Sequence, residues 1–327
     1  MNMRAMFVGS GRRKSGGWFG ALSAAVVGVC LIAGEASAQT TTDGNSVFTM
    51  PDTQTTGGTV RTGTTGGTAS AFTAGGNTTD QLFQQWWWYR VSGVNVREFA
   101  LSGRTSSVAS GNTHTLTFTE PEGFNATLVY KITDGPDSPA TANVSSTLTV
   151  TNTTGSSMTI DVFVYLDYDL QGSGGDVAVL VEPGRMQITD QASGFNGQFM
   201  AVDALQHQVA TFATVRGLLT DADIDDLNGT GLPFASGDFT GAFQWRATIG
   251  AGQSRAFRSA FSLNTPAVPE PPACRADFNG MGGVTLQDVF DYLGAWFVSS
   301  PMAEIDGFAG ITLQDLFDYL GLWFTGC

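Results

Sequence analysis

The segment THTLTFT, residues 113–119, decides the fold class because apolar and polar side chains alternate along it. Leu116 and Phe118 fall on one face of the segment and the threonines on the other, which is the period of a half-buried β-strand. The same alternation recurs in STLTVTN (146–152) and RAFRSAFSL (255–263). Turn-forming residues separate these runs at short intervals. The pattern predicts a mainly β fold, with one antiparallel β-sandwich domain over residues 81–263.

The run TIDVFVYLDYDL (159–170) is apolar more continuously, as expected of a strand that is buried on both faces. A short helix is predicted over residues 220–229, where Thr220 precedes Asp223 as in a helix N-terminus and Gly229 follows. We expect His114, one of only two histidines, to face solvent.

The first 38 residues have the features of a secretory signal. A basic start that includes Arg12, Arg13 and Lys14 precedes an apolar stretch at 18–34, and ASA at 36–38 marks cleavage before Gln39. A retained membrane anchor is the alternative, although the apolar stretch is short for a membrane span. No later segment is apolar enough to cross a bilayer, so we expect a secreted or cell-surface protein without an integral membrane anchor.

The chain is strongly acidic, with a formal net charge of −14. Such a surface repels nucleic acid and anionic membranes, so neither is an expected partner.

The stretch at 39–80 is rich in Thr and Gly and is predicted to be loop with one or two edge strands. Residues 264–273 contain four prolines and are predicted to be an extended linker.

The segment at 274–327 contains two copies of one fifteen-residue pattern, GVTLQDVFDYLGAWF (283–297) and GITLQDLFDYLGLWF (310–324). Apolar residues in both copies recur at helical spacing. A helix this apolar is unstable alone in water, so its twin is the expected packing partner about a pseudo-twofold axis. Cys274 and Cys327 bracket the repeats, and in an exported protein a disulfide between them is expected.

A loop before each helix follows the twelve-residue calcium pattern, in which several oxygen ligands surround a hard cation within one tight turn. These observations predict a small α module of two EF-hand-like loop-helix repeats, with calcium as the cofactor. The predicted oxygen ligands are Asp277, Asn279, Asp288 and the Gly283 carbonyl in the first loop, and Glu304, Asp306, Asp315 and the Gly310 carbonyl in the second.

Residues 274–327 resemble a type I dockerin, and most closely the bacterial variant that ends in Gly-Cys. The resemblance implies that the module plugs into a cohesin domain on a scaffold or cell-surface protein. It also implies that loop positions 10 and 11, which are Leu286 and Gln287 with Leu313 and Gln314, contact that partner. Because both repeats carry the same pair, two symmetry-related poses are implied.

The loops depart from the dockerin pattern at several positions. Position 5, which should supply an oxygen, is Met281 in the first loop and Phe308 in the second. The second loop also starts with Glu304 and has Ala309 in place of Gly. Loss of one ligand lowers calcium affinity, so a module held by the disulfide and by helix packing is the alternative.

An aromatic run at QQWWWYR suggests a polysaccharide-binding strand, because sugar rings stack on aromatic faces. The candidate residues are Trp86, Trp87, Trp88 and Tyr89, of which alternate members would share a face. The alternative is that at least one face of this strand belongs to the core.

Carboxylates gather in two places, at residues 167–176 and at residues 221–226. A pair of them could supply the acid and the base of a glycosidase, or hold calcium, and a solvated acidic loop is the alternative. Our first hypothesis is therefore a non-enzymatic secreted β-sandwich attached through the dockerin-like module. The second hypothesis is a secreted glycoside hydrolase with the same docking tail.

Overall fold

The computed structural model describes residues 39–50, 70–172, 174–271, 274–280, 283–305 and 310–326. These residues belong to one compact unit of the chain. The predicted signal, the candidate ligand Asp306 and the candidate disulfide residue Cys327 lie outside the described residues. Cys274 is disulfide-bonded, and its pairing with Cys327 stays a prediction.

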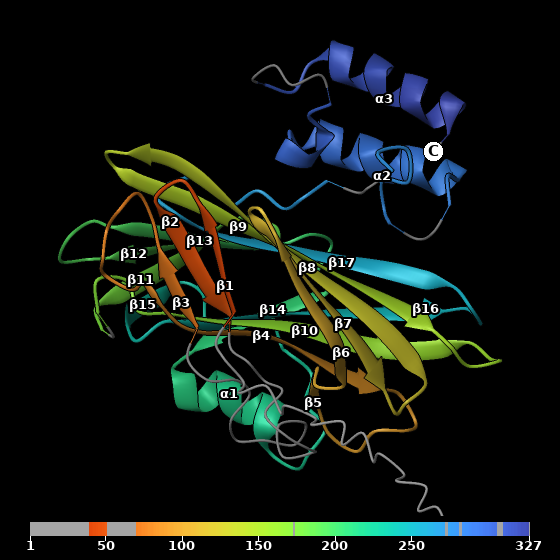
Figure 1. Ribbon diagram of the computed structural model, residues 1–327, viewed down its shortest axis with the longest axis horizontal. Coiled ribbons are helices and arrows are strands. Elements are labelled where there is room, and N and C mark those ends of the chain that lie inside the picture. Colours follow the sequence, from red (N-terminus) through yellow and green to blue (C-terminus); the bar gives the residue numbers. More distant parts are fainter. Residues whose placement is uncertain are drawn as a thin grey trace, which may run out of the picture. The chain divides into compact units, whose positions relative to one another are not determined.

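The described strands form three sheets, in which neighbouring strands are antiparallel (Figure 1). The largest sheet includes all three runs whose side chains alternate in the sequence, and so confirms their assignment as strands. Its nine strands in spatial order are β15 (Phe234–Gly237), β11 (Asp176–Glu182), β12 (Arg185–Asp190), β13 (Asn196–Ala201), β17 (Ser254–Leu263), β9 (Ala140–Asn152), β8 (Phe124–Asp137), β7 (Thr113–Glu120) and β6 (Arg104–Ser110).

A five-stranded sheet packs against the largest sheet and contains the continuous apolar run as its central strand. That strand is buried along nearly its whole length, as predicted for a strand covered on both faces. The spatial order is β14 (Gln206–Ala210), β16 (Thr240–Ile249), β10 (Met158–Tyr168), β4 (Leu82–Val91) and β5 (Phe99–Ala100).

The Thr/Gly-rich segment contributes more structure than the sequence predicted. Its described parts form a three-stranded sheet of β1 (Gln39–Asp43), β2 (Ser46–Met50) and β3 (Ala71–Thr73). Phe48 is fully buried and its ring lies 5.2 Å from that of Tyr130 in β8 and 5.4 Å from that of Phe261 in β17. The segment therefore covers part of the largest sheet, because its few aromatic residues enter the common core.

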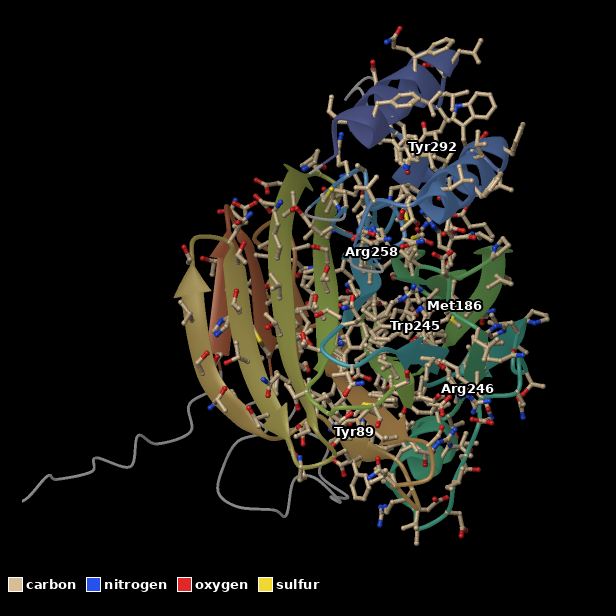
Figure 2. All side chains as sticks on the ribbon, turned by 90° about the vertical axis from the view of Figure 1, so that its right-hand side faces the viewer. Tyr89, Met186, Trp245, Arg246, Arg258 and Tyr292 are labelled. Atoms are coloured by element: carbon tan, nitrogen blue, oxygen red, sulfur yellow. The ribbon has the colours of Figure 1, made fainter. Side chains whose placement is uncertain are left out.

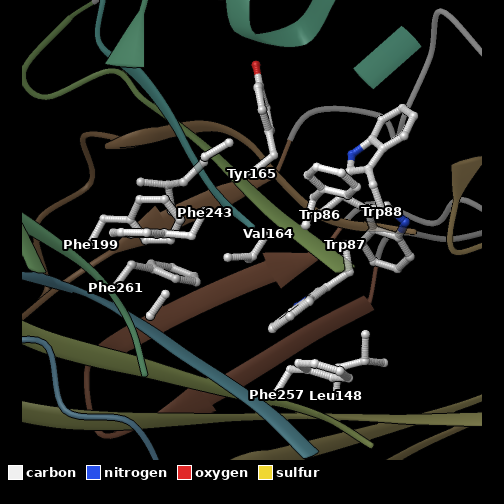
Figure 3. Packing of buried hydrophobic residues seen from close by; sticks show 14 of the residues in the cluster. Trp86, Trp87, Trp88, Leu148, Val164, Tyr165, Phe199, Phe243, Phe257 and Phe261 are labelled. Atoms are coloured by element: carbon white, nitrogen blue, oxygen red, sulfur yellow. The ribbon is translucent and has the colours of Figure 1, made fainter. Parts of the chain in front are cut away.

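Aromatic side chains fill the space between the sheets (Figure 3). The Trp87 ring in β4 stacks on Trp245 in β16 at 5.6 Å, and Trp245 in turn meets Phe257 in β17 at 5.8 Å. Phe199 of the large sheet contacts Phe243 of the five-stranded sheet at 4.8 Å. Burial of such rings is the main favourable contribution to folding of a sandwich that is otherwise rich in small residues.

The helix predicted at residues 220–229 is wrong, because the helix α1 (Phe212–Thr220) ends where the predicted one begins. Val215 and Leu219 lie one turn apart and are the buried residues of α1, which packs against β14 and β16 (Figure 1). The acidic segment that follows is instead held by side chains of the five-stranded sheet. Arg90 Nη1 donates to the Asp225 carbonyl at 2.8 Å, and the Leu227 amide donates to Gln244 at 2.8 Å.

His114 is buried, contrary to the expectation that it faces solvent. Residues two apart on a strand share a face, so His114 lies on the same face as the buried Leu116. One ring nitrogen lies 2.7 Å from Ser107 Oγ and the other 3.4 Å from Thr41 Oγ1.

The proline-rich segment lies against the largest sheet and is not a free spacer. Val268 exchanges two hydrogen bonds with the Asn143 side chain, each 2.9 Å long. Ala267 is fully buried, and its amide donates to Gln198. After this segment come α2 (Leu286–Phe297), the 3-10 turn η1 (Pro301–Ala303) and α3 (Leu313–Thr325). Among the described helices, none has the length and apolar character of a membrane span.

Candidate functional site

The two C-terminal helices begin in the same way because their sequences begin in the same way. Thr285 precedes α2, and its amide and hydroxyl both donate to Asp288 at 2.7 and 2.9 Å. Thr312 and Asp315 repeat this arrangement before α3, at 2.8 and 3.0 Å. Each Thr–Asp pair satisfies backbone groups at a helix N-terminus that would otherwise have no partner. The helices predicted from the repeats are confirmed.

The helices pack on each other through matching residues, and Tyr292 marks this contact in Figure 2. The rings of Tyr292 and Tyr319 stack at 3.9 Å with an angle of 5° between their planes. The Tyr292 hydroxyl donates to the Ala303 carbonyl at 3.0 Å, and the Tyr319 hydroxyl donates to the Ala276 carbonyl at 3.2 Å.

The two tryptophans of the repeats extend this symmetry. Trp296 Nε1 donates to the Thr312 carbonyl at 2.8 Å, and Trp323 Nε1 donates to the Thr285 carbonyl at 2.7 Å. Each repeat therefore makes the same contacts with the other, as a pseudo-twofold relation requires. The predicted pairing of the twin helices is confirmed.

The helix pair buries less of its apolar surface than the sequence predicted. Tyr292 and Tyr319 form the centre, while three large apolar residues of each helix stay exposed. The exposed fractions are 59 % for Leu286, 59 % for Phe290 and 75 % for Phe297 on α2, and 61 % for Leu313, 64 % for Phe317 and 78 % for Phe324 on α3. Two short helices bury only one stripe each, so the rest of a broad apolar face is left uncovered. We call these two sets the α2 stripe and the α3 stripe.

The residues predicted to contact a partner lie at the start of each stripe. Leu286 and Leu313 are stripe members, and Gln287 and Gln314 follow them and are also exposed. Gln287 Nε2 donates to Asp291, and Gln314 Nε2 donates to Asp318, both at 2.8 Å. Each apolar stripe is thus bordered by a fixed amide and a carboxylate. Exposed apolar patches with a polar border are typical of protein-interaction surfaces.

The first predicted calcium loop fits a cation only in part. Asp288 is fully buried, and one of its oxygens already accepts from the Asn279 amide at 3.0 Å. Asp277 accepts from the Gly283 amide at 3.3 Å, and the Asn279 side chain donates to Asp291. Among the described residues, no three Asp, Glu, His or Cys side chains converge as metal ligands. The loop is therefore closed by hydrogen bonds to its own carboxylates.

Of the four predicted ligands of the second loop, the structure describes Glu304, Gly310 and Asp315. Asp315 is fully buried and accepts from the Ile305 amide at 2.7 Å, as Asp288 does in the first loop from Asn279. The two buried carboxylates therefore close their loops in nearly the same way.

A pocket of about 660 Å³ lies beside α2. One wall comes from α2 and the chain on either side of it, and includes Phe278, Phe290 and Val298. The other wall comes from the large sheet and from the turn after β13, with Met200, Val202, Asp203, Arg255 and neighbouring residues. The lining contains no residue of α3. Sequence reasoning missed this pocket because its lining comes from three separate parts of the chain, within residues 182–203, at Arg255 and within residues 278–302.

The structure corrects the carbohydrate-binding interpretation of the aromatic run. Trp86, Trp87, Trp88 and Tyr89 are each at most 2 % exposed. Trp87 and Tyr89 face the large sheet, where the Tyr89 ring meets Phe124 edge-on at 4.8 Å. Trp86 and Trp88 lie on the opposite face (Figure 3), and Trp86 Nε1 donates to the Leu101 carbonyl at 2.9 Å. Both faces of β4 are core, so none of these rings is available to stack on a sugar.

One group of carboxylates gathers where β10 ends and β11 begins. Asp167 is buried and accepts a hydrogen bond from Thr240 at 2.9 Å. Burial raises the pKa of Asp167 to about 8, and the nearby Asp238 and Asp169 add to this rise. Burial, together with the opposite residue Asp190, raises the pKa of Asp176 to about 7. The pKa values of both carboxyl groups therefore lie well above the usual range of aspartate.

The second acidic group lies at the other end of β10. Asp226 and Asp161 both bind Arg90, with Asp161 at 2.9 Å from it. Asp161 precedes Asp167 by six residues on β10, which corresponds to about 20 Å along a strand. The carboxyl groups of glycosidases lie about 5 to 10 Å apart. The two acidic groups therefore do not form one catalytic pair.

No family model matches the chain, and no curated protein matches it. Solved structures give distant likenesses. The Slr1438 protein from Synechocystis has a TM-score of 0.43 and 7 % identity over 71 % of this chain and 97 % of that one. A galactose mutarotase related enzyme from Lactobacillus acidophilus has a TM-score of 0.42 and 5 % identity over 71 % and 99 %.

A bacterial glucoamylase complexed with acarbose has a TM-score of 0.42 and 8 % identity over 90 % of this chain and 39 % of the glucoamylase. Two of these three proteins carry the names of carbohydrate-active enzymes. With TM-scores below 0.5, these likenesses carry no inference about the activity of this chain.

Proposed function

We propose that this chain is an exported β-sandwich protein that attaches to a partner protein through its C-terminal helix pair. The observation that carries the proposal is the pair of exposed apolar stripes, which occur at matching positions of two repeats. Isolated exposed apolar residues are ordinary, but a duplicated apolar surface that the fold leaves uncovered favours a binding role. The β-sandwich is the part that becomes attached, and its aromatic run supports no sugar-binding role.

The partner is a protein with an apolar contact surface bordered by basic residues. Asp291 and Asp318 border the stripes, and the whole chain has a formal net charge of −14. Opposite charges at the border of an interface steer association and exclude acidic competitors. The resemblance of residues 274–327 to type I dockerins makes a cohesin domain on a scaffold or cell surface the first class of partner to test.

Surface plasmon resonance with a panel of type I cohesin domains tests this proposal. We expect the full chain to bind, and a variant with Phe290→Glu and Phe317→Glu together to lose binding. Val108→Glu is the matched control, because Val108 is an equally exposed apolar residue (57 %) on β6 of the large sheet. Undiminished binding by the double variant would contradict the proposal, and failure of every cohesin to bind would reject this class of partner.

The proposal includes calcium at the first loop, with ligands Asp277, Asn279, Asp288 and the Gly283 carbonyl, and at the second, with Glu304, Asp306, Asp315 and the Gly310 carbonyl. Hydrogen bonds already close both loops, so calcium would strengthen the module but would not be needed for its folding. Isothermal titration calorimetry of the full chain with calcium measures binding, and Asp277→Ala removes a first-loop ligand. A titration without heat, together with an unchanged melting temperature in chelator, would reject calcium.

A further inference from the structure

The pocket beside α2 distinguishes the two otherwise equivalent stripes. The α2 and α3 stripes have almost the same exposure and the same bordering Gln and Asp residues. Five residues of α2 line the pocket, namely Gln287, Phe290, Asp291, Gly294 and Ala295. No α3 residue does. Within the part of the chain that the structure describes, this pocket therefore gives an arriving partner additional protein surface beside the α2 stripe.

Several contacts between the large sheet and the C-terminal segment hold the two walls of the pocket together. Arg258 Nη2 in β17 donates to the Phe278 carbonyl at 2.8 Å, and the Ala256 amide donates to the Gly280 carbonyl at 3.2 Å. Met302 packs against a buried cluster that consists of Met200, Val202, Ala260 and Ala267. The pocket is therefore preformed, and a partner gains contacts in it without ordering new structure.

The pocket is lined by apolar side chains and by three carboxylates against one basic residue. Met200, Val202, Phe278, Phe290, Val298 and Met302 supply apolar surface. Glu182, Asp203 and Asp291 are its acidic residues and Arg255 its basic one. Asp291 is held in place by amide donors from Asn279 and Gln287, both at 2.8 Å. An apolar lining that also holds carboxylates suits a side chain with an aliphatic stem and a cationic end.

We propose that the partner docks on the α2 stripe and inserts a lysine or arginine side chain of its contact surface into this pocket. This inference rests on the proposed function and adds the side of the module that is used and the chemistry that selects it. The aliphatic stem lies against Phe290, Val202 and Met200, and the cationic end reaches the carboxylates. The β-sandwich thereby takes part in binding, and the repeats lose their equivalence.

Matched variants of the full chain test the inference. The probe is a fluorescent amphipathic helical peptide of leucine and lysine, and the comparison probe is the same peptide with glutamate in place of lysine. Binding is measured by fluorescence anisotropy. Phe290→Ala and Phe317→Ala are twin truncations on the two stripes. Asp291→Asn and Asp318→Asn are twin isosteric charge removals, and circular dichroism checks that each variant is folded.

We expect Phe290→Ala to weaken binding of the leucine–lysine peptide about tenfold, which corresponds to about 1.4 kcal/mol. Phe317→Ala should weaken it clearly less than Phe290→Ala does. Asp291→Asn should weaken binding more than Asp318→Asn does, and the leucine–glutamate peptide should bind poorly. Equal effects of the twin variants, equal binding of both peptides, or no binding of the leucine–lysine peptide would each overturn the inference.

The double variant with Phe290→Glu and Phe317→Glu distinguishes a failure of this inference from a failure of the proposed function. If the twin single variants have equal effects and the double variant abolishes binding, the stripes bind a partner but the pocket does not select one of them. If the double variant binds the peptide like the unchanged chain, both the inference and the proposed function fail.

Discussion

Removal of one hydroxyl group at the centre of the helix pair gives a sharp test of its pseudo-twofold packing. Tyr292→Phe keeps the ring that stacks on Tyr319 at 3.9 Å, but removes the hydrogen bond to the Ala303 carbonyl. Tyr292 and Ala303 are both fully buried, so that carbonyl is left without this donor. An unsatisfied buried acceptor costs about 1 to 3 kcal/mol. Tyr319→Phe should cost a similar amount, because Tyr319 makes the equivalent bond to Ala276.

Hydrogen exchange measured by mass spectrometry reports this loss of stability separately for each helix and strand. A cost of about 1.4 kcal/mol corresponds to roughly tenfold faster exchange through local opening. Because each hydroxyl group of Tyr292 and Tyr319 bonds to the other repeat, either substitution should accelerate exchange in both α2 and α3. Tyr168→Phe is the control, since the buried Tyr168 in β10 donates to the Ser262 carbonyl at 3.0 Å. That variant should accelerate exchange in the sheets and not in α2 or α3.

The reasoning would be refuted if Tyr292→Phe and Tyr319→Phe left exchange in both helices unchanged. It would also be refuted if each substitution affected only its own helix. Either result would mean that the tyrosine pair does not join the repeats.

Two further predictions concern the charges at the two ends of β10. The raised pKa of Asp167 means that the folded state holds a proton up to about pH 8, whereas the unfolded chain releases it near pH 4. Stability should therefore fall as the pH rises between these values, by up to roughly 1.4 kcal/mol per unit. Asp167→Asn should reduce this slope in urea denaturation, and an unchanged slope would contradict the assignment. At the other end, Arg90→Met leaves the buried carboxylates of Glu98 and Asp161 without this partner, although Arg246 still contacts Asp161. We expect the free energy of unfolding, measured by urea denaturation, to fall by about 3 to 5 kcal/mol. A fall below about 1 kcal/mol would show that this network of ion pairs contributes little to stability.

Strand positions and the start of each repeat helix follow from local sequence. In residues 113–119 the alternation specifies which side chains share a face. Applied to His114, the same rule places it on the buried face with Leu116, and the expectation that it faces solvent did not follow this rule. Thr285 and Asp288 fix the start of α2 through bonds within one turn, so the pattern works without knowledge of the rest of the fold. In α1, the buried Val215 and Leu219 are four residues apart, and this spacing was the available signal for a helix before Thr220.

The sequence by itself determined the strands β4, β7, β9, β10 and β17 of the sandwich and the two repeat helices, because these depend on residues within a few positions of each other. Only the tertiary structure decided that both faces of β4 are core and that Phe290 stays exposed while Tyr292 is buried. It also decided that a pocket forms between α2 and the large sheet. The physical reason is that burial depends on which distant segments cover a face, and periodicity identifies a face without identifying what covers it.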